Sequence, residues 1–337
     1  MFKSTLLINK YINNVKEEIN KLVLQLLLDY YHNKTPLSSL KLKKITENNE
    51  KLNSTLDEFK KIKLNDTIND TTHDINDLLR IACNCGCIDV INFLIENGAD
   101  INKKFKNKET LLYVACEKEN ENLVKILIEH GANVNDEVYG YMDKIGTGIN
   151  PLFISCMKKN ITITKYLIEH GADVNFMTNI DIYIDNDFSC CTPLTLACQG
   201  NCMDLVKILV ENGADVNATI EHLGPRYFGY PQPLCIACIK GNESIVKYLI
   251  EHGADTNAEY NNTDREDSSN YYTPLLHAIE NENESIVNYL IEQGANVNSY
   301  IDNGYYGEKY SPLSIAIDQG NKSIIKCLIE HGANVNR

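Results

Sequence analysis

Cys235 and Cys238 form a Cys-x-x-Cys pair, the residues of this chain that most suggest chemistry. Such a pair is half of a structural zinc site or the core of a thiol redox centre. A zinc site needs a second pair of ligands at metal-binding spacing, and the sequence offers none. We therefore expect no metal, and we expect both thiols to lie within one helix.

Five of the 12 cysteines recur at one position of a repeated pattern, namely Cys83, Cys116, Cys156, Cys198 and Cys238. So many cysteines would suggest disulfides in a small secreted protein, but a shared repeat position favours a reduced, buried, small apolar side chain. Four histidines recur as well, at His130, His170, His252 and His331. They suit the negative end of a helix and lie too far apart to share a metal.

Catalytic motifs are missing from the sequence. Gly146-x-Gly148 lacks the rest of a phosphate-binding loop, and there is no His-Glu-x-x-His or Gly-x-Ser-x-Gly. Paired acidic residues are common, but without a pocket they are ordinary solvated charges. We therefore expect a protein that is not an enzyme and needs no cofactor. An enzyme whose site lies in residues 1–76 is the rival, which an activity screen of that region would test.

The elements that position these residues are short helices, and residues 192–217 are the clearest example. Thr192 is a good N-cap and Pro193 suits the first helical position, which needs no N–H. A second apolar run from Leu205 to Val210 ends before Gly213, which can adopt the left-handed conformation that closes a helix. The segment predicts two helices joined by a turn. Isolated helices shorter than about 12 residues are marginal in water, so the unit needs copies of itself beside it.

The closing glycine recurs at Gly98, Gly131, Gly171, Gly213, Gly253, Gly294 and Gly332. The shared cysteine position lies 15 residues before each glycine. In the last two copies this position is occupied by Ile279 and Ile317. Successive glycines are separated by 33, 40, 42, 40, 41 and 38 residues. The helix pair therefore has a constant length, and insertions are confined to the connectors.

This pattern resembles the ankyrin repeat, which has a 33-residue period and a Thr-Pro-Leu-His-x-Ala signature. The resemblance covers about residues 77–337 and rests on the recurring Thr/Ser-Pro-Leu start and the Gly-Ala-Asp-Val-Asn end. The signature histidine is replaced in every unit, by Arg80, Tyr113, Phe153, Thr195, Cys235, Leu276 and Ser314. His277 occupies the usual core leucine position of the sixth unit, which we therefore expect to be the least well packed.

The resemblance implies an all-α ankyrin-repeat solenoid of stacked helix–turn–helix units with long loop or hairpin fingers, and a non-enzymatic protein-interaction function. The expected units are 77–102, 110–135, 150–175, 192–217, 232–257, 273–298 and 311–336. By the same resemblance, partners contact the fingers and the end of each first helix. Of the 19 tyrosines, 12 fall in the long connectors, together with many acids, and tyrosine is typical of binding loops.

We interpret these segments as an acidic, tyrosine-bearing surface for a protein partner with a basic or basic-aromatic binding segment. The alternatives are drifted loops or a contact surface elsewhere on the array. The predicted protein-binding residues are Tyr139, Tyr141, Met157, Lys158, Tyr183, Asp185, Phe188, Gln199, Tyr227, Phe228, Ile239, Lys240, Tyr260, Glu280, Tyr305 and Tyr306.

Residues 1–76 lack the repeat, and apolar residues from Ile8 to Leu27 follow helical spacing. We expect a helical N-terminal head and linker that cap the first repeat. The alternatives are a helix that docks a partner, as in an adaptor recruiting a ubiquitin ligase or kinase, or membrane-surface binding. Deleting residues 1–70 separates a cap from a docking element, because only loss of a cap destabilises the array.

The net charge of −14 is distributed unevenly, since residues 77–337 carry 20 basic and 36 acidic residues. Such a balance disfavours nucleic acid. No apolar run approaches the roughly 18 residues of a membrane span, and no signal peptide is evident, so we expect a cytoplasmic protein, with the nucleus as the alternative. No polar capping helix follows the seventh unit, so either another chain covers its end face or the polypeptide is truncated.

Overall fold

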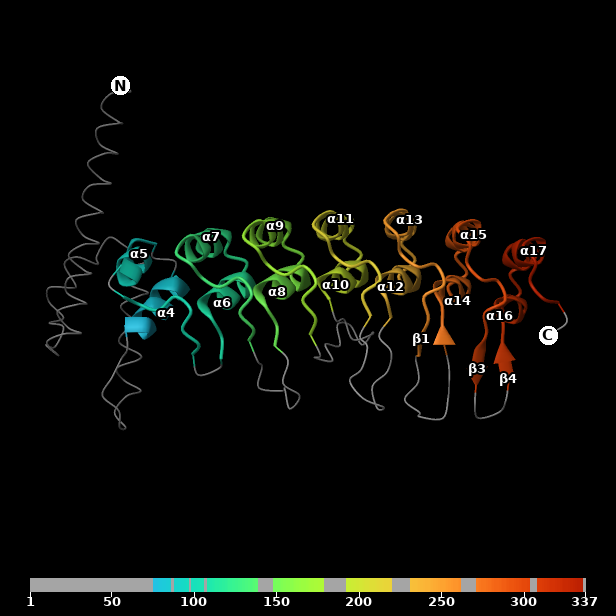
Figure 1. Ribbon diagram of the computed structural model, residues 1–337, viewed down its shortest axis with the longest axis horizontal. Helices are drawn as coiled ribbons and strands as arrows, with labels where there is room; N and C mark the ends of the chain where they lie inside the picture. Colours follow the sequence, from blue (N-terminus) through green and yellow to red (C-terminus); the bar gives the residue numbers. More distant parts are fainter. Residues whose placement is uncertain are drawn as a thin grey trace, which may run out of the picture. The chain divides into compact units, whose positions relative to one another are not determined.

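The computed structural model describes residues 75–85, 88–96, 98–105, 108–138, 148–178, 192–219, 231–261, 271–303 and 308–335 (Figure 1). The chain divides into two compact units. The described residues of the first unit lie within 75–115 and 120–133, and those of the second are 116–119 and the described residues from 134 to 335. The predicted head, residues 1–76, lies almost entirely outside the described residues, so its role stays a prediction.

The described residues form pairs of short helices, as the sequence predicts. The pairs are α4 (Ile75–Cys85) and α5 (Ile88–Glu96), α6 (Leu111–Glu117) and α7 (Glu121–Glu129), α8 (Pro151–Met157) and α9 (Ile161–Glu169), α10 (Pro193–Gln199) and α11 (Met203–Glu211), α12 (Pro233–Ile239) and α13 (Glu243–Glu251), α14 (Pro274–Glu280) and α15 (Glu284–Glu292), and α16 (Pro312–Gln319) and α17 (Lys322–Glu330). We number the corresponding repeats 1 to 7.

Within the second unit the first helices of repeats 3 to 7 pack against one another in order, and the second helices form a parallel row above them (Figure 1). Among the described residues, two hairpins precede first helices. One pairs β1 (Tyr260–Asn261) with β2 (Tyr271–Tyr272), and the other pairs β3 (Ile301–Asn303) with β4 (Glu308–Tyr310); both are antiparallel. The fold class is an all-α repeat solenoid with short hairpins in the connectors.

Local sequence explains the helix ends. Thr192 and Thr195 form a reciprocal capping box, in which each side chain bonds the backbone N–H of the other. Thr195 occupies the position of the missing signature histidine. Its hydroxyl, instead of an imidazole, accepts a hydrogen bond from the backbone N–H of Thr192 at the helix start. At the end of α11, Gly213 has a φ of 89°, and the following amide donates to Leu209 O at 3.0 Å. This is the left-handed closure that glycine adopts without a Cβ penalty.

In repeats 3 to 7, the turn at the closing glycine is hydrogen-bonded to an asparagine side chain of the preceding repeat. Asn175 donates through Nδ2 to Gly213 O at 3.0 Å and accepts from Asp215 N at 2.8 Å. The same two bonds join Asn135 to Gly171 and Asp173, Asn217 to Gly253 and Asp255, Asn257 to Gly294 and Asn296, and Asn298 to Gly332 and Asn334. The terminal Asn of the Gly-Ala-Asx-Val-Asn pattern therefore sets the spacing of neighbouring repeats.

The core lies between the two rows of helices and between successive repeats. Leu205 and Leu209 of α11 are fully buried, as are Ile245 and Leu249 of α13. Burial of such side chains is the main favourable term in folding. We predicted that repeat 6 would be the least well packed, and this prediction is wrong. In repeat 6, Leu276, Ile279 and Leu290 are 0% exposed, and His277 is 5% exposed.

Candidate protein-interaction site

The ends of the first helices carry a row of accessible side chains in repeats 3 to 6, which we call the helix-end strip. It consists of Met157, Lys158, Gln199, Ile239, Lys240 and Glu280. Each is the last residue or the C-cap of α8, α10, α12 or α14, and these four helices pack side by side (Figure 1). Lys158 and Glu280 are exposed and the other four are half-buried. The fold therefore brings together all six helix-end residues predicted from the sequence.

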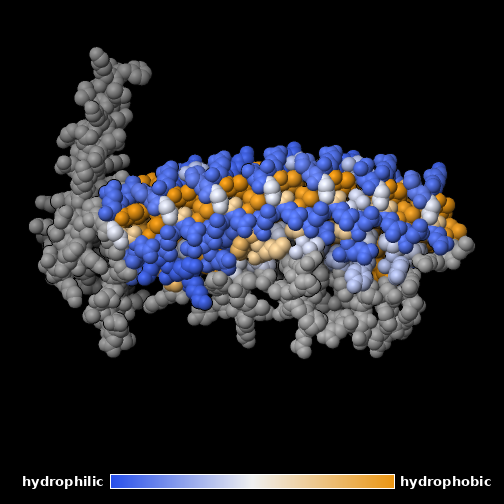
Figure 2. All heavy atoms as spheres, in the orientation of Figure 1, coloured by the Kyte–Doolittle hydropathy of each residue, from blue (hydrophilic) through white to orange (hydrophobic). Residues whose placement is uncertain are grey.

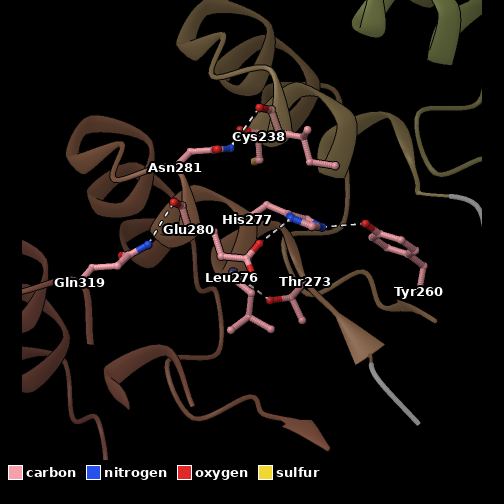
Figure 3. A network of polar contacts seen from close by, with 9 residues as sticks. Cys238, Tyr260, Thr273, Leu276, His277, Glu280, Asn281 and Gln319 are labelled. Atoms are coloured by element: carbon pink, nitrogen blue, oxygen red, sulfur yellow. Dashed lines mark hydrogen bonds and ion pairs between the residues drawn. The ribbon is translucent and has the colours of Figure 1, made fainter. Parts of the chain in front are cut away.

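Side-chain amides fix the spacing of the helix ends at the C-terminal side of this strip. Asn281 donates through Nδ2 to the carbonyl of Ile239 at 3.0 Å and to that of Cys238 at 3.3 Å (Figure 3). Gln319 donates through Nε2 to the carbonyl of Glu280 at 3.0 Å. The last carbonyls of a helix have no partner within the helix, so each bond satisfies one and joins it to the next repeat.

His277 lies beneath the strip and bonds at both ring nitrogens (Figure 3). Its Nε2 is 2.7 Å from the Tyr260 hydroxyl, and its Nδ1 is 3.3 Å from Glu280 Oε2. A carboxylate oxygen accepts hydrogen bonds, so we assign Nδ1 as the donor to Glu280 and Nε2 as the acceptor from the Tyr260 hydroxyl. We call this chain of contacts the Tyr260–His277–Glu280 clamp.

Two tyrosines of the β1–β2 hairpin stack on the same imidazole. The rings of Tyr272 and His277 are 5.0 Å apart with planes 12° from parallel, and those of Tyr260 and His277 are 5.7 Å apart at 24°. Tyr260 and Tyr272 are themselves paired across the hairpin. Burial raises the pKa of both phenols above the ordinary tyrosine value, which keeps the hydroxyl of Tyr260 protonated and able to donate. The clamp therefore attaches the hairpin base to the helix bearing Glu280.

A family model described as ankyrin repeats (3 copies) matches residues 48–138, 78–178, 139–220 and 234–337, which together make up most of the chain. The chain belongs to the ankyrin-repeat family. The human ASB11 ankyrin repeat domain is a similar solved structure, at 23% identity, with a TM-score of 0.52 over 76% of this chain and 98% of that domain. An ankyrin repeat domain from Acinetobacter baumannii AYE is 25% identical, with a TM-score of 0.51 over 66% of this chain and 98% of that one. Comparison with curated proteins found no match.

Tyr260 departs from the role expected for it. The sequence places this residue in an ankyrin finger and predicts an exposed contact, but the side chain is only 4% exposed and its hydroxyl bonds His277. The reason is the short β1–β2 pairing, which turns the hairpin base toward α14. In this structure Tyr260 supports the surface and does not form it.

Sequence reasoning missed the clamp because it interpreted His277 as a packing defect. A signal was present: the histidine at a core leucine position coincides with tyrosines at both ends of the preceding connector. The remaining predicted finger residues lie outside the described residues, so their binding role stays a prediction. They are Tyr139, Tyr141, Tyr183, Asp185, Phe188, Tyr227, Phe228, Tyr305 and Tyr306.

The repeated cysteines are interior side chains, as predicted. Those of repeats 1 to 5 are between 0 and 5% exposed, and all are free thiols. Burial raises the pKa of Cys83, Cys116 and Cys156 to about 12, and it raises the pKa of Cys235 and Cys238 as well. Thiols held protonated in this way are poor nucleophiles and poor metal ligands. Among the described residues, no cluster of three or more His, Cys, Asp or Glu side chains could hold a metal ion.

Among the described residues, no helix has both the length and the apolar character that crossing a bilayer requires.

Proposed function

We propose that this protein is a non-enzymatic scaffold or adaptor that binds a protein partner along the helix-end strip and the adjoining hairpins. The observation that carries the proposal is that side chains from four successive helices are presented together, and that cross-repeat amide bonds fix the ends of two of these helices, α12 and α14. A prearranged surface loses little conformational entropy on binding. Ankyrin repeats are general protein-interaction modules, which agrees with this use of the strip.

The charges along the strip favour a partner segment that binds in one orientation. Lys158 and Lys240 lie in repeats 3 and 5, and Glu280 lies in repeat 6. The exposed Asp318 of α16 extends the acidic end beyond the strip into repeat 7. A basic or basic-aromatic segment fits the acidic end, since opposite charges steer association and fix orientation. The apolar side chains of Met157 and Ile239 supply uncharged contacts beside the two lysines. With a net charge of −14, nucleic acid is a poor alternative partner, and we propose a cytoplasmic location.

The experiment is affinity capture with the full chain and identification of bound proteins by mass spectrometry, followed by titration of the captured partner. Glu280→Gln removes the charge but keeps an oxygen that can accept from His277, so the clamp survives. We expect the affinity to fall at least roughly fivefold.

The matched control is Glu292→Gln, which makes the same change at an exposed position of α15 in the same repeat. Equal affinities of the two variants for the captured partner would contradict the use of the strip. The adaptor with a recruiting N-terminal head stays the alternative, and it concerns residues outside the described part of the chain.

A further inference from the structure

Glu280 is a residue of the helix-end strip whose carboxylate is held by a buried side chain. Figure 2 shows hydrophilic side chains in bands along repeats 3 to 7, so exposed polar groups alone do not distinguish a site on this surface. The Oε2 atom of Glu280 lies 3.3 Å from Nδ1 of His277, and 38% of the glutamate side chain is exposed (Figure 3). No other described residue bonds to this carboxylate. One oxygen is therefore attached to a buried ring, while Oε1 has no bond within the described part of the chain.

The residues at the position of His277 in repeats 3 to 5 are apolar. They are Ile154 of α8, Leu196 of α10 and Ile236 of α12, and all three are buried. A buried imidazole at this position has to be hydrogen-bonded, because an unpaired polar group in the interior is costly. Repeat 6 therefore departs from the preceding repeats at the very residue that contacts Glu280.

Stability alone does not account for this departure. Replacing both partners of a buried hydrogen bond by apolar groups of similar shape can be nearly neutral or stabilising. The paired changes His277→Leu and Tyr260→Phe would fill nearly the same space, and Leu196 shows that a leucine packs well at the equivalent position. An apolar pair cannot donate to a carboxylate. Departures from local packing rules are typical of functional sites, and the property specific to the native pair is its hold on Glu280.

The buried bonds fix both the side chain and the backbone of Glu280. Burial raises the pKa of the Tyr260 phenol, so its hydroxyl stays protonated and donates to Nε2 of His277, which leaves Nδ1 to donate to the carboxylate. The backbone carbonyl of Glu280 accepts from Gln319 Nε2 at 3.0 Å. A side chain that is already ordered loses less conformational entropy when a ligand binds to it.

We propose that Glu280 contacts a lysine or arginine side chain of the protein partner, and that His277 and Tyr260 are positioning residues that hold its carboxylate for this contact. The inference rests on the proposed function, because it names the chemistry that one residue of the helix-end strip recognises. A carboxylate complements a cationic N–H donor, and such charge-assisted bonds are stronger than neutral ones. Since the imidazole occupies Oε2, the basic side chain bonds to Oε1.

Selection of random short peptides displayed on phage against the full chain tests the contact. We expect the selected peptides that depend on the strip to share one basic residue, and either lysine or arginine supports the proposal. Replacing that residue by glutamine in a synthetic peptide should weaken binding to the wild-type chain at least roughly tenfold. The same replacement should have a much smaller effect on binding to the Glu280→Gln variant, because each change removes one partner of the same pair.

Two variants of the clamp separate positioning from stability. The double variant Tyr260→Phe/His277→Leu should unfold at nearly the wild-type temperature, yet bind the peptide at least roughly fivefold more weakly, because Glu280 is no longer held. His277→Asn places an amide donor near the position of Nδ1 and leaves the Tyr260 hydroxyl unpaired. This variant should be less stable than the double variant but bind the peptide more tightly. A purely structural role of the pair predicts the opposite order, with affinity following stability.

Tyr272→Phe is the matched control, since it makes the same chemical change at the residue paired with Tyr260 across the hairpin. The hydroxyl of Tyr272 bonds to no described residue, so this variant should bind the peptide like the wild-type chain.

The outcomes distinguish this inference from the proposed function. Peptides that are weakened by Met157→Ser or Ile239→Ser, but bind the Glu280→Gln and clamp variants as tightly as the wild-type chain, overturn the inference and leave the proposed function intact. Equal affinities of the wild-type chain for the basic and the glutamine-bearing peptide do the same. A selection that yields no strip-dependent peptide contradicts the proposed function as well.

Discussion

The hydroxyl of Tyr260 lies 2.7 Å from Nε2 of His277, and this bond joins the β1–β2 hairpin to the first helix of repeat 6. Both side chains are buried, at 4% and 5% exposure. A histidine at a core leucine position is therefore compensated by a tyrosine that arrives from the preceding connector. The two residues are 17 positions apart in the sequence.

The first prediction is that Tyr260 and His277 are energetically coupled. Tyr260→Phe leaves a buried ring nitrogen unpaired, and His277→Leu leaves a buried hydroxyl unpaired, so each should lower the free energy of unfolding by about 1–3 kcal/mol. Replacing both partners by apolar groups can be nearly neutral, so the double variant should be more stable than the sum of the two effects. Urea unfolding of the four chains measures this. Strictly additive losses would show that the bond contributes nothing.

The second prediction concerns the asparagine side chains between repeats. Asn217→Ala removes the bonds to Gly253 O and Asp255 N, which should cost about 1 kcal/mol because two exposed hydrogen bonds are lost. Asn217→Asp keeps an acceptor for the Asp255 amide and loses the donor, so its loss should be smaller. Hydrogen exchange of the Asp255 amide should accelerate in the alanine variant. Unchanged exchange there would mean that the bond does not persist in solution.

The third prediction concerns the turn between the two helices of repeat 6. Glu282 has a φ of 53°, whereas the equivalent positions of repeats 5 and 7 are Gly241 and Gly320, with φ of 68° and 73°. The left-handed conformation costs a side-chain-bearing residue about 1 kcal/mol, so Glu282→Gly should raise the free energy of unfolding by up to that amount. Gly241→Ala is the reciprocal change and should lower it. Thermal unfolding of both variants gives the signs, and a destabilised Glu282→Gly chain would contradict the argument.

The fourth prediction concerns alkaline pH. Burial raises the pKa of Cys83, Cys116 and Cys156 from 9.0 to about 12. Above about pH 9 the unfolded thiols lose protons that the folded thiols keep, so the unfolded state binds fewer protons and stability falls as pH rises toward 12. Below pH 9 both states are protonated and the thiols contribute no slope. Urea unfolding at several pH values from below pH 9 to above it measures this dependence.

The control for that experiment is the triple alanine variant at the same three positions. Alanine fits a position that already holds a small buried side chain and does not ionise, so the variant should show a shallower loss of stability above pH 9. The phenols of Tyr260, which is buried, and Tyr272, which is half-buried, contribute in the same direction, so the slope should not vanish. A slope as steep as that of the wild-type chain would exclude the cysteines as its source.

Repetition in the sequence was sufficient to predict the helix pairs. A prolyl helix start, an aliphatic run and a closing glycine are local signals that act within a few residues, and they recur often enough to confirm one another. The ends of the first helices were predictable for the same reason, since a constant helix length places Met157, Gln199, Ile239 and Glu280 at equivalent positions.

The contacts between repeats depended on tertiary structure. The partner of His277 lies in the preceding connector, and the partners of Asn281 and Gln319 lie in the preceding repeat. Hydrophobic periodicity records which face of a helix is buried but not which distant polar atom a side chain meets, because that depends on how neighbouring repeats stack. For this reason the sequence indicated a defect at His277 and an exposed contact at Tyr260, while the packed repeats join the two residues in one buried hydrogen bond.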